Sequence, residues 1–228
     1  MTDQVKQELI QIPASYVADH LNHTFYVLLG DRERKDLTDA LVHFVRPLWM
    51  ACVHITEDEI IRLLYETLSD CLRYDNRSYP DDDGLLRFTY AGGIFTGAAV
   101  CMGVAELCTL LGTALGLRVQ TIIGYAGDPA DSGGLHAWNL VWLKEGGREI
   151  PYHFDLTWDL AQYTKHRGFR YYLKSDAYME EHQHQWLRER YPNCPRNRSS
   201  AMIPKIPVAA KRQLCKQFEN MRRSLAQK

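Results

Sequence analysis

The sequence predicts an α+β fold with N-terminal helices, a central helix and an antiparallel sheet, and three observations lead to this prediction. Apolar residues recur at helical spacing within the first 75 positions, a second helical stripe begins at Cys101, and strand-like runs separated by turn formers follow from residue 117. The chain has 228 residues, of which 46% are hydrophobic, so a single core is enough for the fold.

The first 75 residues are predicted to be helical. Thr56 precedes Glu59 in the arrangement of a capping box, and apolar residues then recur on one helical face up to Cys71. Residues 37–48 have a similar stripe that ends near a proline. We therefore expect two or three packed helices before the central part of the chain.

The central helix should begin at Cys101, behind a glycine-rich stretch, and end at Gly116, which suits a C-terminal cap. Three strand-like runs follow, over residues 117–125, 136–143 and 148–158. The second half of the chain therefore combines a helix with an antiparallel sheet.

The last 28 residues differ from the rest in charge. Residues 201–228 contain seven Lys or Arg against Glu219 alone. They also contain a stripe of apolar side chains at helical spacing, which comprises Leu214, Phe218, Met221 and Leu225. We predict one domain over residues 1–200, helical over 1–75 and with its core at about 88–160, followed by a basic amphipathic helix or tail over 201–228.

The composition excludes several classes of protein. With 27 Lys and Arg against 28 Asp and Glu the net charge is −1, so no nucleic-acid partner is expected. The first eight residues are rich in charges and amides where a secretory signal has its apolar region, so we expect a cytoplasmic protein. Residues 88–105 are uncharged but contain four glycines, and no membrane segment is expected there.

The six cysteines are spread along the chain without a CxxC pair or a short Cys/His spacing. This pattern disfavours structural zinc, and neither a metal nor a cofactor is expected. Without an export signal the thiols should stay reduced, so each is either a small buried hydrophobe or a nucleophile.

A hairpin argument brings a histidine and an aspartate together. If residues 144–147 form a four-residue loop, Leu143 faces Arg148 and His136 faces Asp155. Opposed side chains leave the same face of a sheet with their Cβ atoms about 5 Å apart, so the carboxylate can reach one imidazole nitrogen.

Cys101 completes a set of groups that suits nucleophilic catalysis. It lies in the first turn of a helix, where the helix N-terminus and a nearby imidazolium both stabilise a thiolate. His136 can supply that imidazolium, and Asp155 can orient it. Each residue alone also has a structural explanation: Cys101 as a buried filler, His136 as a surface residue, and Asp155 as an edge-strand charge.

Three sequence blocks resemble a known family. They are AVCMGVA at 99–105, LHAWN at 135–139 and HFDLTWD at 153–159. These blocks are similar to the signature blocks of the transglutaminase-like superfamily, and residues 73–75 and 172–176 extend the likeness to bacterial transglutaminase-like proteins. The resemblance implies a papain-like core with Cys101 as nucleophile, His136 as base and Asp155 as orienting carboxylate. Val104 departs from the family, because many relatives have an aromatic residue there.

Further residues are candidates for the same site. An oxyanion hole needs a second donor beside the Cys101 backbone N–H, and Tyr90 and Thr96 are the polar candidates upstream. Trp138 and Trp158 flank the histidine and the aspartate, where they can shield the ion pair and line a substrate groove or simply pack in the core. His182 and His184 would point apart on a helix, so both are predicted at the surface.

The predicted function is thiol-dependent acyl transfer or amide hydrolysis on a peptide or protein substrate, through a Cys101 thioester. Protease, deamidase and transglutaminase activities remain open, because all three share the acyl-enzyme. A second possibility is a catalytically silent papain-like module that binds peptides or glycans. A third takes Cys101, His136 and His153 with Cys108 as zinc ligands, which is disfavoured because Cys108 lies two helical turns further on.

Overall fold

The computed structural model describes residues 55–77, 86–127, 133–161 and 169–226. The predicted stripe at residues 37–48 lies outside this part of the chain. The described helices, with their bounds, are α4 (Glu57–Cys71), α5 (Tyr90–Phe95), α6 (Cys101–Ala114), α7 (Leu156–Ala161), α8 (Asp176–Glu181) and α9 (Val208–Ala226).

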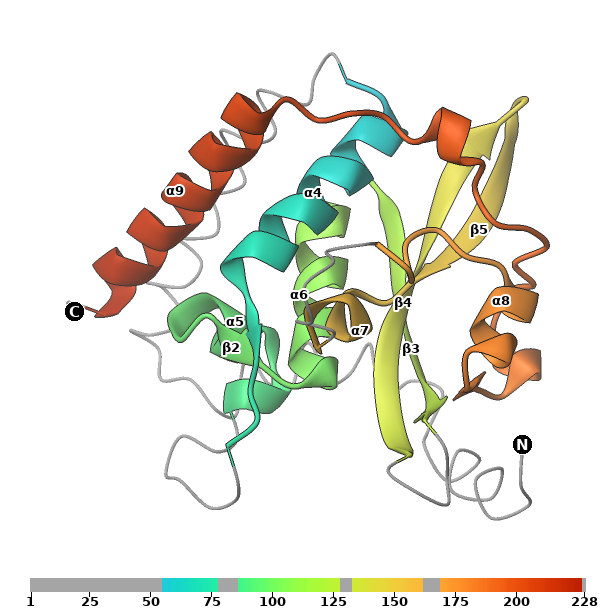
Figure 1. The fold of residues 1–228 in the computed structure, drawn as a ribbon, viewed down its shortest axis with the longest axis horizontal. Coiled ribbons are helices and arrows are strands. Elements are labelled where there is room, and N and C mark those ends of the chain that lie inside the picture. The colour runs from blue at the N-terminus through green and yellow to red at the C-terminus, as the bar shows by residue number, and fades with distance from the viewer. Residues whose placement is uncertain (1–54, 78–85, 128–132, 162–168, 227–228) are drawn as a thin grey trace.

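Four strands form one antiparallel sheet in the order β5-β4-β3-β6. Their bounds are β3 (Arg118–Ala126), β4 (Gly134–Glu145), β5 (Arg148–Phe154) and β6 (His184–Gln185). Helices α4 and α6 cover one face of this sheet, and α8 lies on the other side (Figure 1). The predicted α+β class is confirmed.

The two faces of β4 belong to two apolar clusters. Val141 and Leu143 pack with the helices α4 and α6 in the larger cluster, whereas Trp138 and Leu140 pack with Trp186 in the smaller one. Alternation of side chains along the strand separates the two sets. His136 shares its face with Trp138, and it therefore lies beside the smaller, aromatic cluster.

Helix α4 begins as the sequence predicts. The Thr56 hydroxyl accepts a hydrogen bond from the Glu59 N–H, and the Glu59 carboxylate accepts one from the Thr56 N–H at 2.8 Å. The apolar face of the helix is buried, with Ile61 and Leu68 fully enclosed. This capping box fixes the start of a helix that lines the larger cluster.

Helix α6 begins at Cys101, as predicted, and close contacts hold its first turns. A Cβ atom at Gly103 would lie only 2.5 Å from the carbonyl oxygen of Thr89. Any larger residue at this position would therefore push the helix away. On the sheet side, Asn139 of β4 donates to the carbonyl oxygen of Ala105 at 2.8 Å. These contacts set the position of the cysteine relative to β4.

The predicted register of the β4–β5 hairpin is wrong by two residues. The turn consists of Gly146 and Gly147 alone, both with positive φ (54° and 80°), and Glu145 pairs with Arg148. Such a two-residue turn suits the twist of the strands and requires positive φ at both positions, which glycine adopts freely. A shift of two residues leaves every side chain on its predicted face.

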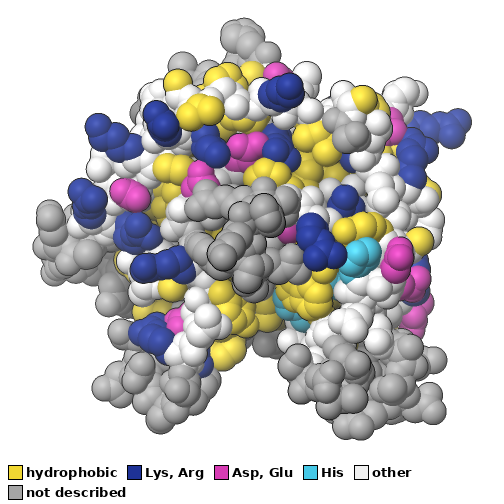
Figure 2. Space-filling view, viewed as in Figure 1, with side chains coloured by type: hydrophobic (Ala, Val, Ile, Leu, Met, Phe, Trp, Pro, Cys, Tyr) yellow, Lys and Arg dark blue, Asp and Glu magenta, His cyan; other side chains and the backbone are white. Residues whose placement is uncertain are grey.

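Helix α9 packs along α4 and buries the predicted apolar stripe as far as it is described (Figure 1). Leu214, Phe218 and Met221 are buried, and Lys211 forms ion pairs with the acidic side chains of α4. Figure 2 shows Lys and Arg side chains spread over the α9 side of the molecule. The division into a domain over 1–200 and a tail stays a prediction.

No helix in the described ranges combines the length and the hydropathy needed to cross a membrane.

Candidate active site

The candidate site lies where α6 begins and β5 ends. Cys101 is the first residue of α6, His136 lies near the start of β4, and Asp155 directly follows β5. The chain enters α6 through Val100, whose backbone is extended and whose N–H donates to the Arg87 carbonyl at 2.9 Å. The cysteine is thereby held at the helix N-terminus, where the helix dipole favours an anion.

The His136 side chain and the backbone N–H of Ala137 lie near the Cys101 thiol, and both stabilise its thiolate form. Burial alone would disfavour the thiolate, but the hydrogen bond and the charge of His136 outweigh it, so the pKa of the Cys101 thiol is lowered. Cys108, two turns further along the same helix, is fully buried, and its pKa is raised instead. Only the first of these two thiols is therefore prepared for nucleophilic chemistry.

His136 is paired with Asp155. Its Nε2 lies 2.6 Å from the Asp155 Oδ2, which confirms the predicted contact despite the shifted register. In the observed register Phe154 pairs with Asn139, the last pair of the two strands. Asp155 is the next residue, so it lies opposite Trp138 and on the same face of the sheet as His136. Burial opposes the imidazolium, but the Asp155 carboxylate and the Cys101 hydrogen bond raise the pKa of His136 to about 10.

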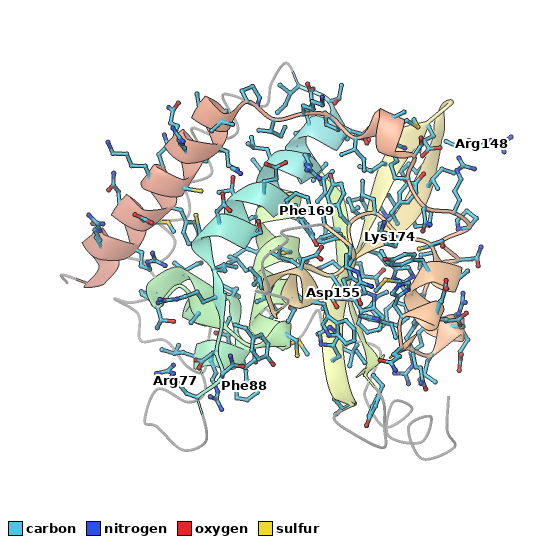
Figure 3. All side chains as sticks on the ribbon, in the orientation of Figure 1. Arg77, Phe88, Arg148, Asp155, Phe169 and Lys174 are labelled. Atoms are coloured by element: carbon cyan, nitrogen blue, oxygen red, sulfur yellow. The ribbon has the colours of Figure 1, made fainter. Side chains whose placement is uncertain are left out.

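Asp155 is fully buried near the centre of the molecule (Figure 3). Its Oδ1 accepts the backbone N–H of Trp158 at 3.0 Å. Although burial would raise its pKa, the charge and the hydrogen bond of His136 hold the pKa of this carboxyl well below its usual range. The carboxylate is therefore ionised and fixed in orientation.

The prediction that His184 lies at the surface is wrong. His184 belongs to strand β6, is completely buried, and places its Nε2 2.9 Å from the Asp155 Oδ2. Because β6 pairs with only the last two residues of β3, it has too few residues for a recognisable alternation in the sequence. Sequence reasoning had no signal for this contact.

The two tryptophans enclose the histidines. Trp138 stacks on His136 with ring centroids 5.8 Å apart, and its Nε1–H donates to the His153 Nδ1 at 2.9 Å. The Trp158 ring lies 6.0 Å from the ring of His136 and 4.6 Å from that of His184. Both indoles therefore exclude water from the polar groups around Asp155.

The oxyanion candidates Tyr90 and Thr96 have hydrogen-bond partners in α5 and its surroundings. The Tyr90 N–H donates to the Glu106 carboxylate at 3.0 Å, and its ring is buried. The Thr96 hydroxyl donates to the Gly92 carbonyl at 2.8 Å. A role for either residue in an oxyanion hole stays a prediction.

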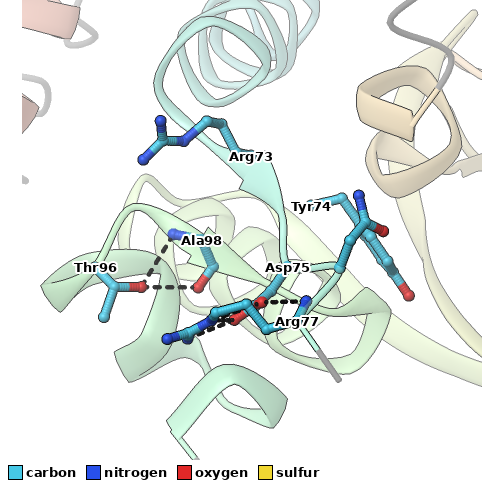
Figure 4. Close-up of a pocket in the computed structure, with 7 residues that line it drawn as sticks. Arg73, Tyr74, Asp75, Arg77, Thr96 and Ala98 are labelled. Carbon is cyan, nitrogen blue, oxygen red and sulfur yellow. Dashed lines mark hydrogen bonds and ion pairs between the residues drawn. The ribbon is translucent and has the colours of Figure 1, made fainter. Parts of the chain in front are cut away.

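A pocket of about 580 Å³ lies beside the nucleophile segment (Figure 4). Strand β1 (Arg73–Tyr74) forms one wall and pairs in parallel with β2 (Ala98–Ala99), three residues before the cysteine. The Tyr74 hydroxyl lies within electrostatic range of Cys101 and Asp155, and burial raises its pKa. The lining residues are Arg73, Tyr74, Asp75, Asn76, Arg77, Thr96 and Ala98.

A second buried histidine–carboxylate pair was not anticipated. The His153 Nε2 lies 2.7 Å from the Asp176 Oδ1, and the other oxygen of this carboxylate accepts the Cys194 N–H at 3.0 Å. Arg188 also forms an ion pair with Asp176. The residue block 172–176, noted only for its resemblance, therefore contributes a structural carboxylate.

Two groups of side chains in the described ranges have the composition of metal ligands. They are His136 with Asp155 and His184, and His153 with Asp176 and Cys194. In the first group, the nitrogen–oxygen separations of 2.6 and 2.9 Å fit hydrogen bonds, because ligands around tetrahedral zinc lie roughly 3.4 Å apart. Neither group contains Cys101 and Cys108, so the structure does not support the zinc set considered above.

Comparisons with known proteins agree with the sequence blocks. Residues 53–152 match the sequence model of the Transglutaminase-like superfamily, which confirms the predicted resemblance. The match contains Cys101 and His136 and ends just before Asp155. No similar protein was found among curated sequences.

Among solved structures, a TGase crystal structure is similar over 68% of this chain and 41% of that chain, with 17% identity and a TM-score of 0.45. A second, described as "a Putative Cysteine Protease from Cytophaga hutchinsonii", is similar over 43% of this chain and 31% of that chain, with 22% identity and a TM-score of 0.33. The chain thus spans less than half the length of either structure.

Proposed function

Starting from the transglutaminase-like core over residues 53–152, we propose that this protein is a thiol enzyme that forms an acyl thioester on Cys101 from an amide substrate. The observation that supports the proposal most directly is the convergence of the three groups: His136 stabilises the thiolate of Cys101, and its Nε2 lies 2.6 Å from the Asp155 Oδ2. Each of the three groups has its pKa shifted in the direction that the chemistry needs.

In the first step the Cys101 thiolate attacks the amide carbonyl carbon and forms a carbon–sulfur bond. The carbon–nitrogen bond then breaks, and the His136 imidazolium gives its proton to the leaving amine or ammonia. Asp155 stabilises the imidazolium and fixes the ring. The products of this step are a thioester and a neutral His136.

In the second step water or an amine attacks the thioester, and His136 accepts the proton of that nucleophile. The carbon–sulfur bond breaks and the thiolate is restored. Attack by water gives hydrolysis, and attack by an amine gives acyl transfer. The substrate we propose is a peptide or a glutamine side chain, part of which the pocket lined by Tyr74 and Ala98 could hold.

Alkylation of Cys101 tests the first part of the proposal. We expect iodoacetamide to label Cys101 in the intact protein below pH 7, and labelling to fall at least about tenfold in His136→Ala, because the partner that stabilises the thiolate is lost. Asp155→Asn should weaken the same labelling. Cys108→Ser is the control for the buried thiol and should leave the labelling unchanged. Equal labelling in the intact protein and His136→Ala would refute the activated thiol.

Intact-mass analysis after incubation with a mixed peptide pool tests turnover. We expect an acyl adduct on Cys101 that disappears in Cys101→Ser. Ammonia release would then identify a deamidase, incorporation of a fluorescent primary amine a transferase, and new peptide termini a protease. Peptide binding without any adduct would instead support the catalytically silent module.

A further inference from the structure

The Asp155 carboxylate has two histidine partners on one oxygen. Its Oδ2 lies 2.6 Å from the His136 Nε2 and 2.9 Å from the His184 Nε2. The ring of His184 is completely buried and is surrounded by aromatic side chains, those of Trp158, Trp138 and Tyr171, with centroids at 4.6, 5.1 and 5.4 Å. The family-type triad uses only the first of these two histidines.

The hydrogen-bond partners of His184 determine where its hydrogens are. Its Nδ1 lies 2.9 Å from the carbonyl oxygen of His182, and a carbonyl oxygen can only accept, so the Nδ1 must donate. Its Nε2 faces Asp155, which as an ionised carboxylate can also only accept. Hydrogen bonds to both acceptors at once require a hydrogen on each ring nitrogen, which is the imidazolium form.

We propose that His184 is a positioning residue of the active site: a second, buried imidazolium that shares the Asp155 carboxylate with His136. This inference rests on the proposed function for its catalytic meaning. Together with the Trp158 N–H on the other carboxylate oxygen, His184 prevents Asp155 from rotating away from His136.

The second cation also affects proton transfer. Asp155 alone would hold the proton on His136 very firmly, and a proton held too firmly is poorly donated to a leaving amine. The ring centroids of His184 and His136 lie 5.7 Å apart. At this distance the positive charge of His184 disfavours the charge on His136 and favours the thiolate of Cys101. The titratable groups that face His184 in the described ranges are His136, His153, Asp155 and Tyr171.

The variant that tests this is His184→Gln, because glutamine retains a neutral donor for Asp155 but removes the charge. Removal of a positive charge raises the pKa of every group nearby, so the acidic limb of the Cys101 alkylation profile should move up by about one pH unit, equivalent to about tenfold slower labelling on that limb. The matched control is His182→Gln, since the His182 ring stacks on Tyr178 and only its backbone carbonyl reaches His184. In His182→Gln the acidic limb of the Cys101 alkylation profile should lie at the same pH as in the unsubstituted protein.

A fall in labelling rate with an unshifted acidic limb in His184→Gln would mean that His184 only supports the packing, and would overturn the proposal. A second measurement needs no variant. Nitrogen-15 NMR of the histidines in the intact protein at pH 7 should show both nitrogens of His184 protonated, and a neutral tautomer would also overturn it. If iodoacetamide did not label Cys101 in the intact protein below pH 7, the proposed function would fail. The NMR result would still decide the charge of His184 independently.

Discussion

Ionisable side chains in the core show how burial sets their protonation. Glu106 of α6 is fully buried, and burial raises its pKa to about 8 even though the Tyr90 N–H donates to it. Asp159 behaves similarly: burial raises its pKa to about 7, although the Tyr65 hydroxyl and two backbone N–H groups donate to it. Each carboxyl group also connects two helices near the candidate site: Glu106 of α6 accepts from Tyr90 of α5, and Asp159 of α7 accepts from Tyr65 of α4.

Glu106 predicts a pH dependence of stability. Its pKa is raised on folding from 4.5 to about 8, so the stabilising effect of its proton is complete below pH 4.5 and is lost as the pH rises toward 8. Glu106→Gln retains an acceptor for Tyr90 without a charge. We expect the free energy of unfolding of this variant to exceed that of the unsubstituted chain by about 4 kcal/mol at pH 8.5, and by less than about 1 kcal/mol at pH 5. Urea denaturation at both pH values measures this difference, and equal values at pH 8.5 would contradict it.

At the scale of the elements, helical spacing was the reliable signal. The capping box at Thr56 and the start of α6 at Cys101 are both in the structure, because each depends on contacts between residues three or four positions apart. The hairpin register was wrong because a four-residue loop and a two-glycine turn both fit the same letters at 144–147. The contact between His136 and Asp155 was still correctly predicted, since both registers keep the two residues on one face.

The packing of α9 on α4 is the element contact that can be tested most directly. Phe218 is completely buried on a helix that packs against α4 and α5, so Phe218→Ala should lower the free energy of unfolding by about 3 kcal/mol. Lys216→Ala, on the exposed side of the same helix, is the control and should change it by less than about 0.5 kcal/mol. Thermal and urea denaturation provide both values. A small effect of Phe218→Ala would mean that α9 adds little to the stability of the fold.

Across the whole molecule, the segment between β6 and α9 joins parts that are distant in the sequence. Arg198, whose side chain is 2% exposed, forms ion pairs with Glu145 at the hairpin and with Asp58 at the start of α4. The carboxylate of Asp176 binds His153 on β5 and the backbone of Cys194. Strand β6, which carries His184, is held at the edge of the same sheet by its pairing with Tyr125 and Ala126 of β3.

Arg198 predicts a large loss of stability on substitution. Arg198→Met would leave Asp58 without its cation and Glu145 with Arg196 alone, and we expect the free energy of unfolding to fall by roughly 3 kcal/mol at pH 7. The matched control is Arg196→Met, because Arg196 is more than half exposed and its ion pair with the same glutamate should contribute little. Urea denaturation compares the two, and similar small losses would show that the buried pair is not what joins these segments.

The sequence by itself determined the local features of this protein: the helix that begins at the cysteine, the apolar faces of α4 and α9, and the shared face of His136 and Asp155. Each follows from a period of two or of 3.6 residues, which short segments already show. Only the tertiary structure decided which other groups reach the carboxylate. His184 reaches Asp155 through a two-residue strand, 29 positions away in the sequence, and the stacking of Trp138 and Trp158 depends on the same packing. Contacts of this kind have no period along the chain, because they arise from the meeting of separate elements.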